Sequence, residues 1–219
     1  MPKKQVKKGE QSASLAPFPK LEQKQYLEMT ELEAQQIYVI PNFLHGKECD
    51  ALVQYFEKNL PPKENVDKPK RGYAFRNNDR QALEDADLAQ EIWKGMETVV
   101  QASAMGNIKV PKGLNSNIRV YRYRKGHSFG AHYDESVQDK ATGLWTDWTL
   151  LIYLNQDMVG GETVFYKDSS SKNRKPAPIV VQPEKGMALL HRHGQHCLLH
   201  EAMEVTEGSK WVLRSDVLV

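Results

Sequence analysis

The spacing of hydrophobic positions changes near residue 114, and this change divides the chain into two kinds of structure. Before it, apolar residues recur three and four positions apart over about 46–59 and 82–103, which predicts two amphipathic helices. After it, they alternate or form short runs separated by glycines, which predicts strands. The predicted strands are 118–123, 146–155, 162–166, 179–181, 187–191 and 210–217. Many short strands after a helical first half are typical of a sandwich, a barrel or a jelly roll.

Charge and composition refine this into three regions. Residues 1–25 hold six lysines against two glutamates, a net charge of +4, with few aliphatic residues, so we expect a disordered basic tail. Such a tail is a solubilising segment, a nuclear import signal or a contact for an anionic surface. Residues 26–110 form the helical and β support region, which includes a strand at 37–40 and a long loop at 61–80. Residues 111–219 form the β core.

The overall composition excludes several classes of protein. Hydrophobic residues make up 40% and charged residues 26% of 219 residues, which is typical of a globular chain, and the net charge of +2 favours neither nucleic acid nor membrane. No apolar run approaches the roughly 18 residues of a membrane span. The N-terminus has no apolar segment of a secretory signal, and two cysteines, Cys49 and Cys197, cannot form a disulfide framework. We therefore expect the cytoplasm or the nucleus; the oligomeric state stays open.

His132 and Asp134 are the first candidate metal ligands. They lie two residues apart in a predicted strand end, so their side chains share one face and can reach one ion. A second histidine would complete the two-histidine, one-carboxylate triad of non-haem Fe(II) oxygenases, which leaves three coordination positions open. His200 follows Asp134 by 66 residues and precedes Lys210 by ten, which makes it the best third ligand, with His193 and His196 as alternatives.

A candidate anion site lies in the last predicted strand. Lys210 and Arg214 share a face of this strand with Val212 between them. Two cations on the inner face of a sheet destabilise the fold unless they meet an anion, and a dicarboxylate co-substrate is such an anion. Tyr153, in the strand over 146–155, has a hydroxyl that could donate to the same carboxylate.

The order of these motifs resembles one known family. In chain order they are His132-x-Asp134, Tyr153-Leu154-Asn155, Gly160-Gly161-Glu162-Thr163, Gly186-x-Ala188-Leu189 and His200 with Lys210-Trp211. Over residues 114–219 this resembles the 2-oxoglutarate- and Fe(II)-dependent dioxygenases, in the prolyl 4-hydroxylase-like branch and near its uncharacterised fungal and plant members. The resemblance implies a double-stranded β-helix, or jelly-roll, core. It also implies Fe(II), 2-oxoglutarate and O2, with ascorbate as an optional reductant.

The resemblance also assigns roles to residues. It implies that His132, Asp134 and His200 bind iron, and that Lys210 and Tyr153 bind the distal carboxylate of 2-oxoglutarate. Arg214 stands near the place where prolyl hydroxylases have a second tryptophan, so it is expected to share or take over the carboxylate contact. Two further pocket residues are expected at Tyr123 and Thr163.

The implied reaction is hydroxylation of a C–H bond, with succinate and CO2 as co-products. The retained carboxylate of Asp134 favours hydroxylation over halogenation. The substrate is expected to be a protein or peptide, and nucleic acid is possible through the basic tail and the basic loop at 167–178. The expected substrate rim consists of Arg76, Asn78, Arg80 and Trp145.

Two alternative functions remain. An oxidative demethylase of nucleic acid or protein is one, although the chain lacks the Arg-x-Asn-x-Thr-x-x-x-Arg pattern of the AlkB-like branch. The other is a jelly-roll module that binds metal without catalysis.

Overall fold

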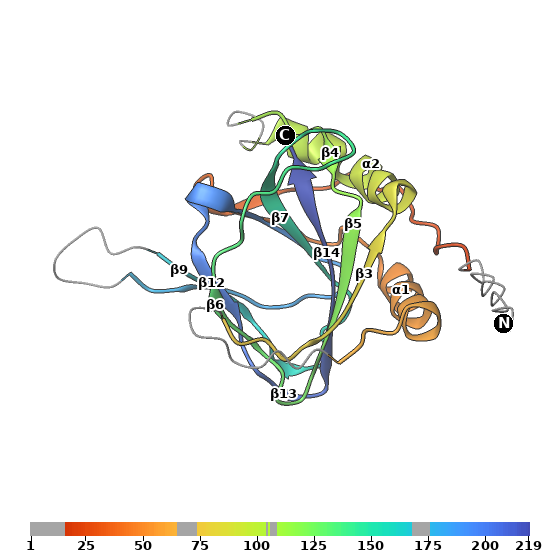
Figure 1. Cartoon of the computed structure of the whole chain (residues 1–219), viewed down its shortest axis with the longest axis vertical. Helices are drawn as coiled ribbons and strands as arrows, with labels where there is room; N and C mark the ends of the chain where they lie inside the picture. Colours follow the sequence, from red (N-terminus) through yellow and green to blue (C-terminus); the bar gives the residue numbers. More distant parts are fainter. Residues whose placement is uncertain (1–15, 65–73, 104, 106–108, 168–175) are drawn as a thin grey trace, which may run out of the picture.

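Two facing antiparallel sheets form the centre of the molecule (Figure 1). The computed structural model describes residues 16–64, 74–103, 105, 109–167 and 176–219, so residues 1–15 of the predicted tail, part of the predicted loop at 61–80 and most of the basic loop at 167–178 lie outside it. Within the described ranges, no helix is long and apolar enough to cross a membrane.

The larger sheet carries most of the core. Its strands, in spatial order, are β1 (Thr30–Glu33), β2 (Ile37–Ile40), β11 (Ala188–Arg192), β7 (Thr146–Tyr153), β14 (Ser209–Leu218), β5 (Asn117–Arg124) and β3 (Asp79–Glu84), and β4 (Gly113–Leu114) also pairs with β14. The smaller sheet consists of β10 (Ile179–Val181), β9 (Thr163–Tyr166), β12 (Leu199–Ala202) and β6 (Phe129–His132), and β8 (Val159–Gly160) pairs separately with β13 (Val205–Glu207). The two sheets form the predicted jelly-roll, a mainly β fold with helical support.

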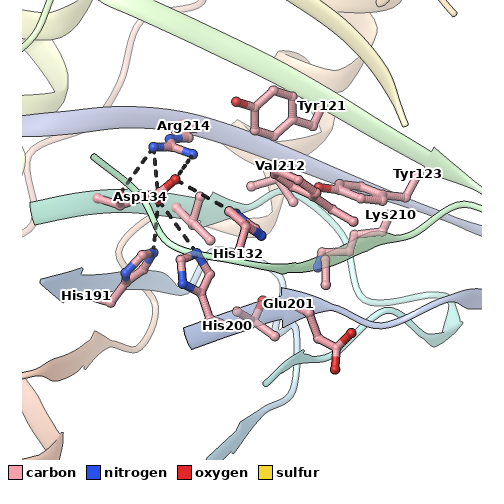
Figure 2. A pocket seen from close by; sticks show the side chains of 15 residues that line it. Tyr121, Tyr123, His132, Asp134, His191, His200, Glu201, Lys210, Val212 and Arg214 are labelled. Atoms are coloured by element: carbon pink, nitrogen blue, oxygen red, sulfur yellow. Dashed lines mark hydrogen bonds and ion pairs between the residues drawn. The ribbon is translucent and has the colours of Figure 1, made fainter. Parts of the chain in front are cut away.

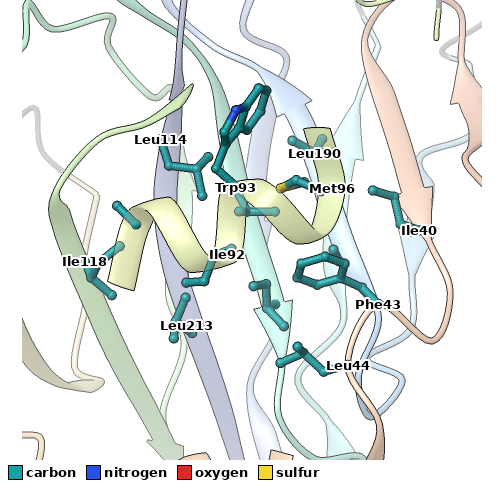
Figure 3. Packing of buried hydrophobic residues seen from close by; sticks show 14 of the residues in the cluster. Ile40, Phe43, Leu44, Ile92, Trp93, Met96, Leu114, Ile118, Leu190 and Leu213 are labelled. Carbon is teal, nitrogen blue, oxygen red and sulfur yellow. The ribbon is translucent and has the colours of Figure 1, made fainter. Parts of the chain in front are cut away.

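Two helices cover the outer face of the larger sheet (Figure 1). They are α1 (Gly46–Asn59) and α2 (Ala86–Ala102), close to the predicted ranges. Ile92, Trp93 and Met96 of α2 are buried and belong to one core cluster with Leu213 of β14 (Figure 3). Burial of these apolar side chains, each contributing about 1.5–3 kcal/mol, holds the helix on the sheet.

The alternation along β14 separates the core from the site. Trp211, Leu213 and Val217 face the helices and join the larger apolar cluster, whereas Val212 belongs to a second cluster between the sheets. Because successive side chains point to opposite faces, Lys210 and Arg214 share the inner face with Val212. This strand therefore carries charged side chains into the interior.

β3 differs from the prediction, which placed a loop up to residue 80 and a helix from residue 82. Residues Asp79–Glu84 pair with β5 along their whole length, and α2 starts only at Ala86. Their side chains are good helix formers, but pairing with a neighbouring strand outweighs that local preference. The helix begins where Asp85 accepts a hydrogen bond from the amide of Leu88 at 2.9 Å, which is an N-cap.

Candidate metal centre and its pocket

Three predicted ligands converge between the two sheets. His132 of β6 lies opposite His200 of β12, and Asp134 follows two residues beyond the end of β6. The Nε2 atom of His132 is 3.8 Å from Asp134 Oδ1, and the Nε2 atom of His200 is 3.7 Å from Asp134 Oδ2. One ligand atom from each of the three lies within 4.8 Å of the others, so they form a set that could hold one metal ion.

Backbone contacts fix the orientation of both imidazoles. Nδ1 of His132 lies 2.8 Å from the carbonyl of Gly130, and Nδ1 of His200 lies 2.9 Å from the carbonyl of Leu198. A carbonyl only accepts, so each Nδ1 carries the proton and each Nε2 presents a lone pair toward Asp134. Two oriented Nε2 lone pairs beside a carboxylate are a donor set that fits Fe(II).

Burial also sets the protonation states that a metal needs. Burial, with a smaller effect of His200, lowers the pKa of His132 to about 4, and burial likewise lowers the pKa of His200. Burial opposes ionisation of Asp134, but Arg214 and the nearby histidines outweigh it and hold the carboxyl pKa well below its usual value. Near neutral pH the imidazoles are therefore neutral and the carboxylate is charged, which are the forms that bind metal.

Arg214 reaches the metal end of the pocket. Its guanidinium contacts Asp134 at 3.0 Å and 3.2 Å (Figure 2). It also contacts Asp216 at 3.3 Å. Thr149 donates a hydrogen bond of 2.8 Å to the same Asp134 carboxylate, and Arg119 forms an ion pair with Asp216. Arg214 and Thr149 thus hold the Asp134 carboxylate in place. Arg214 contacts this carboxylate and does not lie beside Lys210 as a second cation for 2-oxoglutarate.

Lys210 occupies the opposite end of the pocket. Its ammonium donates to the carbonyl of Gly161 at 2.6 Å and lies 5.2 Å and 5.3 Å from the ring centres of Tyr123 and Tyr153. Burial lowers the pKa of Lys210 to about 7, and in the described part of the chain no carboxylate lies within ion-pair distance of it. A buried ammonium with only a carbonyl and ring faces around it lacks a counter-charge, which an anion in the pocket could supply.

Glycine at position 161 allows the backbone there to approach the Lys210 side chain closely. Gly161 has a φ of +76°, and a Cβ atom there would lie 3.2 Å from Cδ of Lys210 and 3.0 Å from Cγ2 of Val205. Only glycine adopts this backbone conformation without strain. The Gly160-Gly161 motif therefore shapes the place where the Lys210 ammonium sits.

Of the other predicted co-substrate residues, two border the pocket directly. Tyr123 and Thr163 are among the lining side chains, whereas Tyr153 is fully buried behind them with its hydroxyl 2.7 Å from Thr163 Oγ1. The pocket is lined by Tyr121, Tyr123, Phe129, His132, Asp134, Thr149, Leu151, Thr163, His191, His200, Glu201, Ala202, Lys210, Val212 and Arg214. Tyr153 thus orients Thr163 rather than lining the pocket itself.

The other histidines of the C-terminal half differ in their distance from the ligand set. His196 is exposed in a short 3-10 helix, and His193 is buried with Nδ1 3.2 Å from Thr149 Oγ1, so neither joins the ligand set. His191, which was not among the predicted ligands, lines the pocket with Nε2 3.7 Å from Asp134 Oδ2. His191, Cys197 and His200 form a second possible set, but it does not use the Asp134 carboxylate.

Sequence reasoning missed Thr149 and Phe129 as site residues. Thr149 of β7 donates a hydrogen bond to Asp134 and so orients this carboxylate. The ring of Phe129 stacks on His132 with centroids 3.6 Å apart. Regular alternation would place Phe129 and His132, three residues apart, on opposite faces of β6, so their spacing gave no signal; the register shift in the pairing of β6 with β12 brings the two rings together.

The predicted rim residues lie in different environments. Asn78 is fully buried and its amide donates to the carbonyl of Asp79, so it is not a rim residue. Trp145 is 50% exposed. The guanidinium of Arg76 lies 5.1 Å from the ring centre of Phe129, and Arg80 is half-buried on β3.

Comparisons with known proteins agree with this geometry. Residues 118–215 match the model of the 2OG-Fe(II) oxygenase superfamily. Prolyl 4-hydroxylase 2 of Arabidopsis thaliana is 29% identical over 202 residues, which cover 80% of this chain and 64% of that protein, so the chain spans about two thirds of its length.

Two solved structures share the fold. A viral collagen prolyl hydroxylase from Paramecium Bursaria Chlorella virus-1, in a 2-oxoglutarate complex, has a TM-score of 0.57 at 21% identity and covers 85% of this chain and 97% of its own. A Trichoplax adhaerens prolyl hydroxylase, in complex with a hypoxia inducible factor peptide, has a TM-score of 0.59 at 16% identity and covers 84% of each chain. Residues 118–215, which carry the converging ligand set, are thus similar to the 2OG-Fe(II) oxygenase superfamily, and the chain shares the fold of the prolyl hydroxylases.

Proposed function

We propose that this chain is an Fe(II)- and 2-oxoglutarate-dependent dioxygenase that hydroxylates prolyl residues of a protein or peptide. The observation that carries the proposal is the pocket itself, with His132, Asp134 and His200 at one end and Lys210 at the other. The Arabidopsis relative is a prolyl 4-hydroxylase and the Trichoplax enzyme binds a peptide, which supports this substrate class over nucleic acid.

At the metal end, the residues of the chain bind and orient. His132, Asp134 and His200 would hold Fe(II). These three side chains would occupy three of its six coordination positions and leave three for other ligands. Arg214 and Thr149 hold the Asp134 carboxylate in place through their hydrogen bonds. The chemistry that such a centre supplies when loaded is the activation of O2 at the expense of 2-oxoglutarate, which becomes succinate and CO2.

At the other end, Lys210 would bind the distal carboxylate of 2-oxoglutarate. Its ammonium lies on the same strand face as Arg214, four residues away, which corresponds to about 13 Å along the strand. Leu151 and Val212 line the wall between the two ends and exclude water from it. An ion pair in such surroundings is stronger than one in water.

The test combines a spectroscopic and a chemical readout. Purified chain with Fe(II) and 2-oxoglutarate under argon is expected to show a visible metal-to-ligand charge-transfer band. In air it is expected to form succinate slowly without substrate, and mass spectrometry of treated proline-containing peptides is expected to show +16 Da on proline. His132→Ala and His200→Ala should remove all three signals, because each loses an oriented Nε2 ligand.

His196→Ala is the matched control, because this exposed histidine lies near His200 but outside the ligand set. It should leave the band and the succinate unchanged. Absence of both band and succinate would support a binding module instead of an enzyme. Succinate with oxidised nucleosides but no hydroxylated peptide would support the demethylase alternative.

A further inference from the structure

Arg80, on the inner face of β3, has no partner that explains its place. The described residues include no carboxylate within ion-pair or hydrogen-bond distance of its guanidinium, although the side chain is half-buried. The neighbouring arginines differ, because Arg122 and Arg124 both bind Asp79 on the outer face of the sheet. An unpaired, partly desolvated guanidinium destabilises a fold, so its presence points to a ligand.

The register of the sheet places Arg80 beside the pocket. Arg80 pairs with Tyr121 of β5, and Tyr121 pairs with Val212 of β14. Directly paired residues project to the same face, so these three side chains form one row on the inner face. Tyr121 and Val212 line the pocket, and Figure 2 shows Tyr121 beyond Val212 and Arg214. Arg80 therefore stands one strand outside the pocket wall.

The row continues outward to another cation. Lys63 forms a β-bridge with Arg80, with backbone hydrogen bonds of 2.8 Å and 3.0 Å, so its side chain lies on the same face. Lys63 is exposed. The row on this face thus runs from the exposed Lys63 through Arg80 to Tyr121 at the pocket.

The charge around Arg80 is also unbalanced. Burial lowers the pKa of Arg80, and repulsion from Arg76, Arg119 and Arg214 adds to this effect, whereas Tyr121 opposes it. Two carboxylates, Asp134 and Asp216, neutralise part of this charge through Arg214 and Arg119. A divalent metal bound at Asp134 would add positive charge at the same end. An anion entering along the row therefore meets a positive potential.

We propose that Arg80 binds an acidic side chain of the peptide substrate, next to the residue that reacts. The inference rests on the proposed function and names a class of its substrate, an acidic peptide segment. The co-substrate is a poor candidate for this anion. Lys210, the cation proposed for the co-substrate, lines the pocket and pairs with Tyr123, one row away from the row of Arg80. Arg80 does not line the pocket. An anion at Arg80 must belong to a larger molecule that extends out of the pocket.

The experiment compares matched peptides on the loaded chain. Short proline peptides carry Glu, Gln or Lys at one position on either side of the proline. Fluorescence anisotropy measures their binding to the chain loaded with redox-inert Mn(II) and 2-oxoglutarate, and kcat/KM with Fe(II) measures hydroxylation. The best Glu peptide is expected to bind about tenfold more tightly than its Gln form, as a charge-assisted contact requires.

Two variants locate the effect at Arg80. Arg80→Gln should bind the Glu and Gln peptides equally, and Arg80→Glu should prefer the Lys peptide. Arg124→Gln removes the same charge from the outer face and should keep the full preference for Glu, since Asp79 retains Arg122. Succinate formation without substrate should stay at the wild-type rate in Arg124→Gln, because Arg124 binds Asp79 on the outer face of the sheet.

The outcomes separate this inference from the proposed function. Hydroxyproline formed equally from Glu and Gln peptides, or a Glu preference that survives in Arg80→Gln, overturns the role of Arg80 and leaves the enzyme reaction intact. Absence of measurable peptide binding overturns it as well, as does tighter binding of a single-stranded oligonucleotide than of any Glu peptide. Absence of succinate in air contradicts the proposed function, whereas anisotropy alone decides the Arg80 contact.

Discussion

Replacing Lys210 with methionine should stabilise the metal-free protein while removing its affinity for 2-oxoglutarate. Burial lowers the pKa of this lysine from 10.5 to about 7. At about 1.4 kcal/mol per pKa unit, keeping the ammonium buried below pH 7 destabilises the folded state by about 5 kcal/mol. The variant loses the hydrogen bond to the Gly161 carbonyl, which offsets about 1–3 kcal/mol of that gain. Methionine retains the length of the side chain, so no large cavity forms.

The stability gained by Lys210→Met should depend on pH. Between pH 7 and 10.5 the unfolded chain binds the Lys210 proton and the folded chain does not, so the stability of the wild-type protein rises with pH across this window. The advantage of Lys210→Met should therefore be about 3 kcal/mol larger at pH 6.5 than at pH 9.5. Urea denaturation of the metal-free protein at both pH values measures it.

A control and a second measurement complete the test. Lys94→Met removes a half-exposed lysine of α2 and should show no such pH-dependent gain. With Mn(II) present, 2-oxoglutarate should raise the unfolding midpoint of the wild-type protein and not that of Lys210→Met. If Lys210→Met is less stable than the wild-type protein at pH 6.5, Lys210 already has an anionic partner in the free protein, and the reasoning fails.

Three further predictions follow from the same pocket. The affinity of the loaded wild-type protein for 2-oxoglutarate should fall up to tenfold per unit as pH rises above 7, because the neutral Lys210 must first take up a proton, and calorimetry in buffers of different ionisation enthalpy should detect that uptake. Arg214→Leu should leave Asp134 and Asp216 without their shared cation, destabilise the fold by about 3 kcal/mol and weaken Mn(II) binding measured by EPR, whereas Arg214→Lys should restore part of the Mn(II) affinity. Gly161→Ala should destabilise the fold by about 1–2 kcal/mol and raise the KM for 2-oxoglutarate, because the new Cβ presses on the Lys210 side chain; an unchanged KM would contradict the role given to this glycine.

Local spacing predicted two ligands of the triad, whereas His200 was chosen from its distance to Lys210 and from the order of the family motifs. His132 and Asp134 lie two residues apart, and strand alternation predicted that they share one face, although β6 ends at His132 and Asp134 lies two residues beyond it. The structure adds what spacing cannot give, namely the carbonyls of Gly130 and Leu198 that direct the two Nε2 lone pairs. Those contacts come from the chain's own backbone, yet they depend on side-chain torsions that a sequence does not specify.

β3 shows where local reasoning fails. Gln81, Ala82, Leu83 and Glu84 have high helix propensity, and the apolar spacing of α2 extends back into them. Their conformation is decided by β5, which is more than 30 residues away and pairs with them along six residues. A long-range partner of this kind leaves no trace in a short window of sequence, so Arg80 was predicted in a loop rather than in a row with Tyr121.

The different roles of Lys210 and Arg214 follow from the order of side chains on one strand. Sequence alone placed both cations on one face of β14 and left open which of them meets the co-substrate. The metal carboxylate Asp134 lies two residues beyond the end of β6, and the fold brings it to Arg214, 80 residues away along the chain. Arg214 is thereby paired with Asp134 and Asp216, whereas Lys210 has only a carbonyl and two rings. An already paired guanidinium gains little free energy from a further carboxylate. We therefore expect a dicarboxylate to bind Lys210 rather than Arg214.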